Sequence, residues 1–136
     1  TPGFFINGTK LAGWGSYPGF KGMVDDARRA AEKLAAEGIE VEVIDPRTLV
    51  PLDKNLILES VKKTEHLVIV QEAVRRGGVA SDIASIVQSE AFDYLDAPIE
   101  IVAGKNTPIP FNVQLEKASV PQQADVIEAV QKVLHL

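Results

Sequence analysis

Apolar and polar positions alternate along the chain in a way that predicts helices and strands in turn from residue 23 onward. Residues 23–37 carry an apolar stripe at helical spacing with charged residues on the opposite side, and Gly38 follows as a C-cap. Residues 39–45 alternate apolar with acidic positions, which is typical of a half-buried strand. Pro46 has no amide hydrogen and ends the pairing.

A second helix and a more deeply buried strand follow. Asp53 is suited to be the N-cap of a helix that runs to about Lys63, because its carboxylate can accept hydrogen bonds from free amide groups of the first turn. Residues 66–71 are almost wholly apolar, as in strands that are buried on both faces of a parallel sheet. Gly77 and Gly78 then turn the chain into a third helix.

The last part of the chain continues the series. A short apolar strand is expected at residues 99–102, then a proline-containing loop, and then a helix over residues 122–134. The alternation predicts an α/β fold, namely a three-layer α/β/α sandwich with a mainly parallel sheet and right-handed crossovers. Residues 1–22 hold six of the ten glycines, so the only element expected there is a strand or hairpin within residues 4–15.

Composition limits the classes of protein to which the chain can belong. Its 136 residues, 46% of them hydrophobic, fit one compact domain over residues 1–136. The formal charge of -5 argues against nucleic acid, and no apolar run approaches the roughly 20 residues that would span a membrane. Without cysteine, disulfides and thiolate metal sites are excluded. The expected location, the cytoplasm or the mitochondrial matrix of a eukaryote, is compatible with this composition, which does not by itself name the compartment. Met23 is the only methionine and the chain begins at Thr1, so we expect a piece of a longer protein.

Ligands of open α/β sheets usually bind beyond the carboxyl ends of the strands, so the residues that follow the predicted strands are candidates for a site. Gly77 and Gly78 could offer amide groups to a phosphate, but the chain has neither of the common glycine-rich phosphate motifs. Close packing of strand against helix is the favoured interpretation, because a tight turn needs glycine in any case. Glu72 could transfer protons, yet a hydrogen-bonded or ion-paired role is favoured because Arg75 and Arg76 are near in sequence.

A second group of polar residues surrounds the turn that follows the first of these strands. Asp45, Arg47 and Asp53 are expected to form a small ion-pair and capping network there, with a role in stability. The two histidines, His66 and His135, lack the spacing of metal ligands, and no serine lies in a GxSxG motif. We therefore expect no catalytic residue, no cofactor ligand and no metal ligand within the chain.

Five segments of the sequence carry a resemblance to a known family. They are EGIEVEVIDPRTLVPLD (37–53), ILESVKKTEHLVIVQEA (57–73), GGVASDIAS (77–85), FDYLDAPIEIVAGKNTPIPF (92–111) and LEKASVPQQADVIEAVQKVL (115–134). From Ala31 onward the chain resembles the C-terminal, transketolase-like domain of the beta subunits of pyruvate, branched-chain 2-oxo acid and acetoin dehydrogenases. The start departs from the family: the GWGS turn at 13–16 is present, but 17–22 is interpreted as extra loop before the first helix.

The resemblance implies a five-stranded mixed sheet with one antiparallel edge strand. It also implies that the parent protein is an oxidoreductase that performs the oxidative decarboxylation of pyruvate or a branched-chain 2-oxo acid. Thiamine diphosphate and magnesium would be bound by the alpha subunit and by the amino-terminal domain of the beta subunit. The present domain would then bind no cofactor, would be inactive by itself, and would contact the alpha subunit and a second beta subunit.

The resemblance further implies a docking surface for the peripheral subunit-binding domain of the dihydrolipoyl acyltransferase, which presents arginine and lysine. Asp96 matches the acidic position of the family, and the terminal carboxylate of Leu136 would be the second acceptor. From the sequence alone, a solvated loop acid ahead of Pro98 is an equally good interpretation of Asp96.

Two other hypotheses remain open. The chain could be an independent small-molecule or nucleotide-binding α/β module that uses the Gly77 to Gly78 turn, or a free-standing paralogue that keeps the fold only for dimerisation. Tight nucleotide binding that is lost when Gly78 is replaced by a bulky residue would favour the first. A gene that ends upstream of Thr1 would favour the second.

Overall fold

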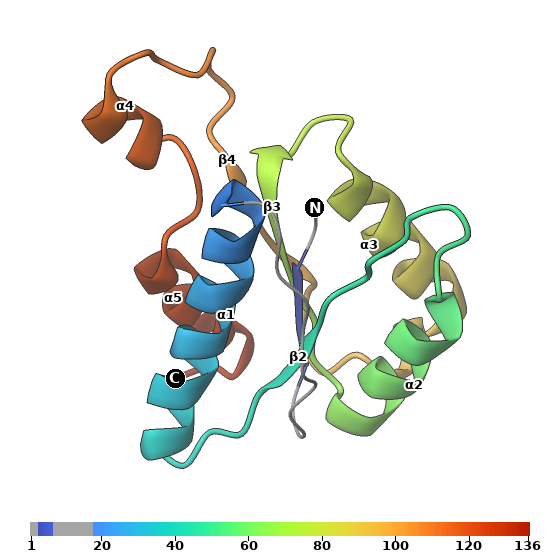
Figure 1. Ribbon diagram of the computed structural model, residues 1–136. Helices are drawn as coiled ribbons and strands as arrows, with labels where there is room; N and C mark the ends of the chain where they lie inside the picture. The colour runs from blue at the N-terminus through green and yellow to red at the C-terminus, as the bar shows by residue number, and fades with distance from the viewer. Residues whose placement is uncertain (1–2, 7–17) are drawn as a thin grey trace.

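The computed structural model describes residues 3–6 and 18–136, with side chains from residue 24 onward. Its strands form one sheet between two layers of helices (Figure 1). The strands are β1 (Gly3–Ile6), β2 (Glu42–Ile44), β3 (Val68–Val74) and β4 (Glu100–Gly104), in the order β2-β1-β3-β4. One face is covered by α1 (Pro18–Ala36) and α5 (Gln123–Val133), and the other by α2 (Lys54–Thr64) and α3 (Val79–Glu90). The expected three-layer α/β/α architecture is confirmed.

The sheet differs from the expectation in its number of strands and in the place of its antiparallel strand. Among the described residues it has four strands, not five. The proline-containing segment after β4 forms a loop, as expected, and the short helix α4 (Val113–Lys117). The expected antiparallel edge strand is also wrong for this part of the chain. β1 is antiparallel but lies inside the sheet, since Phe5 is paired with Val43 on one side and with Val68 on the other.

The first helix begins earlier than the sequence suggested. The sequence suggested a loop at residues 18–22, but these residues form the beginning of α1. Pro18 is tolerated at the first position because the first amide groups of a helix have no partner within the helix. The helix ends at Ala36, and Gly38 follows as the predicted cap, with a φ of 83° in the left-handed region. The amide of Ile39 donates to the carbonyl of Leu34 at 2.9 Å, which completes the cap. The turn expected at 13–16 lies outside the described residues.

The core is divided by the sheet into two apolar clusters that β3 joins. Leu67 and Ile69 pack against α2 and α3, whereas Val68 and Val70 pack against α1 and α5. All four are buried, as the apolar run in the sequence predicted for a strand covered on both faces. Burial of each such side chain contributes about 1.5–3 kcal/mol. This strand is therefore the part of the sheet that fixes both helical layers.

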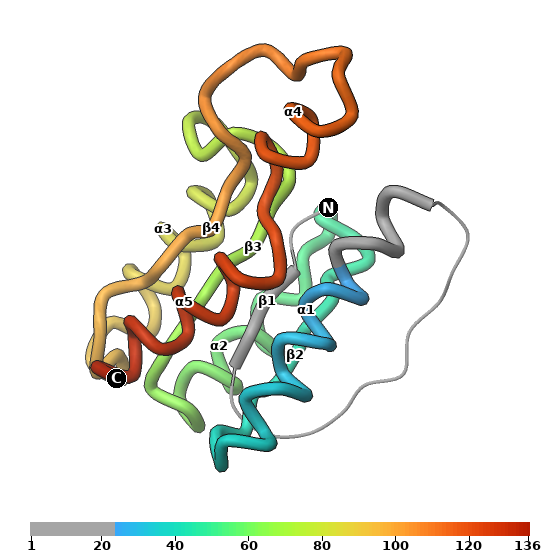
Figure 2. Tube along the Cα trace, turned by 90° about the vertical axis from the view of Figure 1, so that its left-hand side faces the viewer, coloured from blue at the N-terminus to red at the C-terminus, as the bar shows by residue number. Residues whose placement is uncertain are grey.

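Residues 105–121 form an arm that projects beyond the layers at the carboxyl ends of β3 and β4 (Figure 2). The base of the arm is closed by a hydrogen bond from the amide of Lys105 to the carbonyl of Ser119 at 2.9 Å. Within the arm, the side chain of Asn112 caps α4 by accepting from the amides of Gln114 and Leu115. No helix in the described part of the chain is long and apolar enough to cross a membrane.

Candidate functional site

The turn between β3 and α3 is organised by a buried side-chain amide that the sequence did not single out. Gln71, which is 3% exposed, donates from Nε2 to the carbonyl of Val74 at 2.8 Å. Its Oε1 accepts from the amide of Ala80 in the first turn of α3 at 3.0 Å. Gln71 thus satisfies groups on both sides of the turn. A glutamine at the end of an apolar run, followed by two glycines, was the signal available in the sequence.

The two glycines of this turn have different physical requirements. A Cβ atom on Gly78 would collide with the side-chain amide of Gln71 and with the carbonyl of Val74, so this position demands a residue without a side chain. Gly77 has open space around it but a φ of 66°, which side chains disfavour. Close packing of strand against helix therefore accounts for both. Two amides in the first turn of α3 are also engaged within the protein, because Ala80 donates to Gln71 and Ser81 to the carbonyl of Gly78.

Glu72 lies next to this turn but does not join it through its side chain. Glu72, Arg75 and Arg76 are exposed, and no ion pair within residues 24–136 connects them. The backbone of Glu72 has a closer neighbour: a Cβ atom on Gly104 of β4 would collide with its carbonyl oxygen. Glu72 therefore takes part, through its backbone, in the close contact between β3 and β4.

The residues expected to form a network after β2 are only partly connected. Asp53 caps α2 as predicted, since its Oδ1 accepts from the amide of Leu56 at 3.2 Å. Arg47 is exposed and forms no ion pair with the described acids. One carboxylate oxygen of Asp45 is buried without a hydrogen-bond partner among the described residues. The capping interaction is present, whereas no ion pair joins Asp45, Arg47 and Asp53.

A polar contact that the sequence did not reveal joins β2 to α2. The hydroxyl of buried Ser60 donates to Glu42 Oε2 at 2.6 Å, and Lys63 Nζ lies 3.9 Å from the same carboxylate. Eighteen positions separate Glu42 from Ser60, so no local pattern indicates the contact. It attaches the edge strand of the described sheet to the helix that covers it.

The two predicted docking residues lie at the end of the molecule where β4 begins. The amide of Asp96 donates to the carbonyl of Glu65 at 2.8 Å, while the residue itself is exposed. Lys132 Nζ binds Glu100 Oε2 at 2.9 Å and fixes the last turn of α5 to the start of β4. Leu136, which is 76% exposed, follows that turn four positions later. Asp96 and Leu136 are therefore both near this ion pair along the chain.

Exposed aromatic side chains adjoin the docking residues in the sequence. Phe92 and Tyr94, both about half exposed or more, belong to the short 3-10 helix η1 (Phe92–Tyr94) that leads to Asp96. Lys62 Nζ lies 5.3 Å from the centre of the Tyr94 ring, which is within the range of a cation–π contact. The surface before β4 thus presents apolar, acidic and basic groups together.

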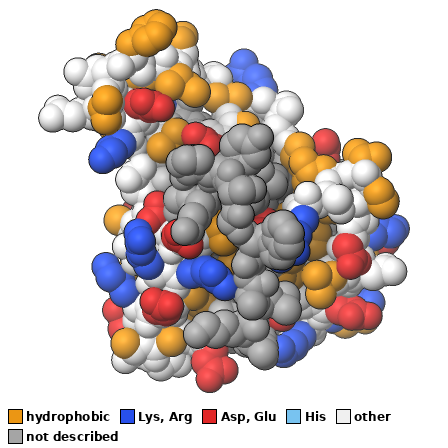
Figure 3. Space-filling model, viewed as in Figure 1, with side chains coloured by type: hydrophobic (Ala, Val, Ile, Leu, Met, Phe, Trp, Pro, Cys, Tyr) orange, Lys and Arg blue, Asp and Glu red, His pale blue; other side chains and the backbone are white. Residues whose placement is uncertain are grey.

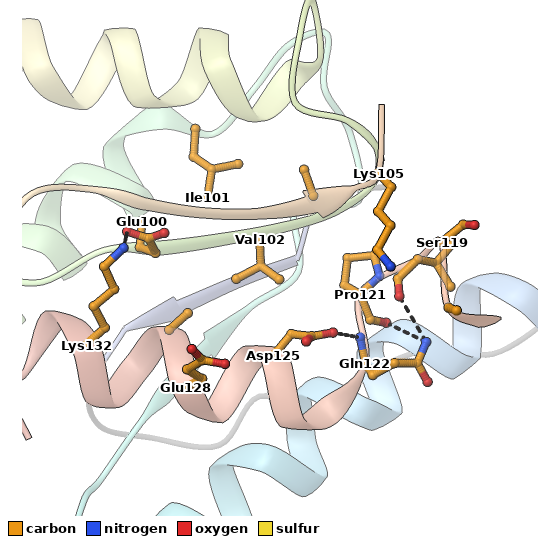
Figure 4. Close-up of a pocket in the computed structure, with 14 residues that line it drawn as sticks. Glu100, Ile101, Val102, Lys105, Ser119, Pro121, Gln122, Asp125, Glu128 and Lys132 are labelled. Carbon is orange, nitrogen blue, oxygen red and sulfur yellow. Dashed lines mark hydrogen bonds and ion pairs between the residues drawn. The ribbon is translucent and has the colours of Figure 1, made fainter. Parts of the chain in front are cut away.

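A groove of about 540 Å³ runs between β4 and α5 (Figure 4). Glu128 extends from the side of α5 that faces the strand, and Asp125 lies on the same side with its carboxylate directed to the amide of Gln122. Ile101 points to the other face of the sheet. Glu100 and Lys132 lie at one end of the groove, and Lys105 and Ser119 lie at the other. Since β4 is the last strand in the order of the described sheet, the groove follows an open strand edge.

Four exposed apolar side chains lie on the arm. Ile109, Phe111, Val113 and Leu115 are each more than half exposed, and Phe111 is fully exposed. Figure 3 shows hydrophobic side chains gathered at the top of the molecule, where the arm lies. Contiguous apolar surface of this kind is typical of contact sites between proteins.

The described residues contain no arrangement suited to a metal ion. Within residues 3–6 and 18–136, no three histidine, cysteine, aspartate or glutamate side chains lie close enough together to hold one. The acids and histidines named in the sequence are scattered over both ends of the sheet. Neither the strand ends nor the groove offers the oxygen-rich cluster that magnesium requires.

Comparison with known proteins places this geometry in a class. The family model of the transketolase C-terminal domain matches residues 19–126, and the chain belongs to that family. Within it, the chain is 57% identical over 116 residues to the pyruvate dehydrogenase E1 component subunit beta of Rickettsia felis, covering 85% of this chain and 36% of that protein. It is 46% identical over 110 residues to the mitochondrial subunit beta-1 of Arabidopsis thaliana, covering 81% of this chain and 30% of the relative.

A solved structure supports the same assignment. The chain of a split gene transketolase, described as an inactive beta4 tetramer, superposes with a TM-score of 0.69 at 32% identity, covering 84% of this chain and 36% of that one. The resemblance to the C-terminal domain of 2-oxo acid dehydrogenase beta subunits is confirmed. The chain spans about a third of the length of the curated relatives it matches.

Proposed function

We propose that this domain serves assembly in the beta subunit of a thiamine diphosphate-dependent 2-oxo acid dehydrogenase. Its parent would be an oxidoreductase that decarboxylates pyruvate oxidatively, because the relatives named above are pyruvate dehydrogenase beta subunits. The observation that carries the assembly role is the exposed apolar surface of the arm, centred on Phe111. The cytoplasm of a bacterium, or the mitochondrion of a eukaryote, is the proposed location, which the name of the Arabidopsis relative supports.

The proposed division of labour leaves coenzyme chemistry to other parts of the enzyme. Thiamine diphosphate and magnesium would be held by the alpha subunit and by the amino-terminal domain of the beta subunit. One feature of the described residues supports this proposal: the amides of Ala80 and Ser81 in the first turn of α3 are already bonded within the protein. The 3-10 helix, the groove and the arm present surfaces suited to protein contacts instead.

The arm is the proposed contact with a second beta subunit or with the alpha subunit. Burial of its apolar side chains would remove them from water, at about 25 cal/mol for each Å² covered. A self-assembled relative provides a precedent, since the solved split gene transketolase is named as a beta4 tetramer. A homomeric contact would place the same surface on both subunits around a twofold axis.

Docking of the acyltransferase is proposed at the opposite end of β4, through Asp96 and the carboxylate of Leu136. Both residues are exposed. The Lys132–Glu100 ion pair joins α5, which precedes Leu136, to β4, which follows Asp96. Arginine and lysine of the peripheral subunit-binding domain would pair with these acids and would accelerate association at low ionic strength. The exposed aromatic rings of η1 would add apolar contact at the same surface.

Sedimentation velocity on the 136-residue chain tests the assembly role. We expect concentration-dependent association that a double variant, Ile109→Ser with Phe111→Ser, reduces at least tenfold in its association constant. Val50→Ser is the matched control, because Val50 is 94% exposed but lies outside the arm. A strictly monomeric chain at high concentration, or equal effects of the two variants, would contradict the proposal. Turnover of pyruvate by the chain with added thiamine diphosphate and magnesium would contradict the proposed division of labour.

A further inference from the structure

The outer edge of β4 carries backbone groups that the domain leaves unpaired. The amide of Glu100 donates to the carbonyl of Leu67 at 3.1 Å, so Glu100 and Val102 direct their backbone groups toward β3. Successive residues of a strand direct these groups to opposite edges. Ile101 and Ala103 therefore face away from β3, and no described residue pairs with their outward amides and carbonyls.

The groove beside this edge has the dimensions of a short extended segment. At one end, the amide of Lys105 is bonded to Ser119 and closes the passage. At the other end, the Lys132–Glu100 ion pair crosses from α5 to β4 (Figure 4). The strand between these two points would be about 13 Å long at roughly 3.3 Å per residue. The strand edge thus accommodates about four or five extended residues.

The acidic side chains on the α5 wall of the groove favour a basic extended segment. Glu128 is exposed and forms no ion pair among the described residues, and Asp125 accepts from the amide of Gln122 at 2.7 Å. Both acids lie on the side of α5 that faces β4. In an added strand, every second side chain would point toward this wall, because the side-chain period of a strand is two. Lysine or arginine at those positions would complement the two acids.

We propose that the β4 edge binds a short extended peptide segment with basic residues at alternate positions, supplied by a protein partner. The segment adds as a fifth strand, pairs with the backbone of Ile101 and Ala103, and directs its basic side chains to Asp125 and Glu128. This mode joins backbone pairing, which supplies affinity, to side-chain contacts, which supply specificity. The inference does not depend on the proposed assembly role, since it uses neither the exposed apolar side chains of the arm nor the docking residues.

Nuclear magnetic resonance on the 136-residue chain tests the proposal with a blocked peptide of alternating valine and lysine, about five residues long. We expect the amides of Ile101 and Ala103 to become protected from hydrogen exchange on titration. The same alternation with glutamate in place of lysine should leave them unprotected. Glu128→Lys should raise the Kd about three- to fivefold, as expected for the loss of an exposed pair. Glu59→Lys on α2 is the matched control and should change the Kd less than twofold.

Three results would overturn the proposal. The first is the absence of protection at Ile101 and Ala103 with millimolar peptide, which would reduce any binding to general attraction between charges. The second is an equal effect of Glu128→Lys and Glu59→Lys. The third is protection of both amides at high protein concentration without peptide, because a second copy of the chain would then occupy the edge. Thermal unfolding of both variants verifies that each is folded before the titrations are compared.

Discussion

The side-chain amide of Gln71 lies in the space that a Cβ atom on Gly78 would require. The amide is held there by two hydrogen bonds, to the carbonyl of Val74 at 2.8 Å and from the amide of Ala80 at 3.0 Å. The position of the Gln71 side chain thus requires a glycine at position 78. The side chain joins the end of β3 to the beginning of α3 and leaves no space for a larger residue at position 78.

Replacing Gly78 by alanine should therefore destabilise the domain by about 2–3 kcal/mol, because overpacking adds to the loss of the Gln71 hydrogen bonds. Gly77→Ala is the matched control. Its side chain would meet open space, so only the left-handed backbone opposes it, at a cost of about 1 kcal/mol. Urea unfolding measures both values. A smaller loss at position 78 than at position 77 would show that the Gln71 side chain can move aside.

Removal of the α2 cap should also lower stability. Asp53→Ala leaves the amide of Leu56 without its side-chain acceptor, and such N-cap substitutions typically cost about 1 kcal/mol. Glu59→Ala, in the exposed middle of the same helix, should alter the free energy of unfolding by less than about 0.5 kcal/mol. Chemical denaturation followed by circular dichroism compares the two variants, and equal losses would refute a specific capping role.

The contact between β2 and α2 leads to a third expectation. Ser60→Ala removes the donor that lies 2.6 Å from Glu42, whose side chain is 15% exposed. Because the carboxylate is charged and largely covered, we expect a loss of about 1.5–3 kcal/mol in unfolding free energy. Ser85→Ala, an exposed serine on α3, is the control and should be nearly neutral. Thermal and urea unfolding should agree; a neutral Ser60→Ala would mean that solvent replaces the hydroxyl.

Charge reversal at the proposed docking surface should weaken acyltransferase binding. Asp96→Lys places a cation opposite the arginine and lysine of the partner, and we expect the Kd for the peripheral subunit-binding domain to rise about three- to tenfold at low salt. The effect should shrink as ionic strength increases. Glu116→Lys on the arm provides the same change of charge at the other end of β4. Calorimetric titration at two salt concentrations measures both, and unchanged affinity for Asp96→Lys would remove this residue from the surface.

Local rules predicted the elements whose causes are local. The Asp53 cap, the left-handed Gly38 and the buried strand β3 each depend on residues close to them in the chain, and each is confirmed. The place of β1 depends on pairing with two distant strands, which no neighbouring residue specifies. A count of five strands came from the resemblance and was wrong for the described residues.

The candidate sites depend even more on contacts between residues that are distant in the sequence. Glycines at 77 and 78 were recognisable from the sequence, but the partner that explains Gly78 is Gln71, which appeared there only as the end of a strand. The β4–α5 groove was not foreseen, because its walls come from two separate segments, within residues 100–105 and 118–132, that only the tertiary fold brings together. Whether Asp96 is a docking acid or a loop acid likewise depends on a partner outside the chain.

The alternation of Leu67, Val68, Ile69 and Val70 between the two apolar clusters makes β3 common to both helical layers. Loss of either helical layer would expose one face of β3 to water. We therefore expect that neither layer unfolds while the other stays native. The domain should consequently unfold as one cooperative unit, with the amides of this strand among the last to exchange. A partner that binds at any surface of the folded domain would then raise the unfolding free energy of the whole domain.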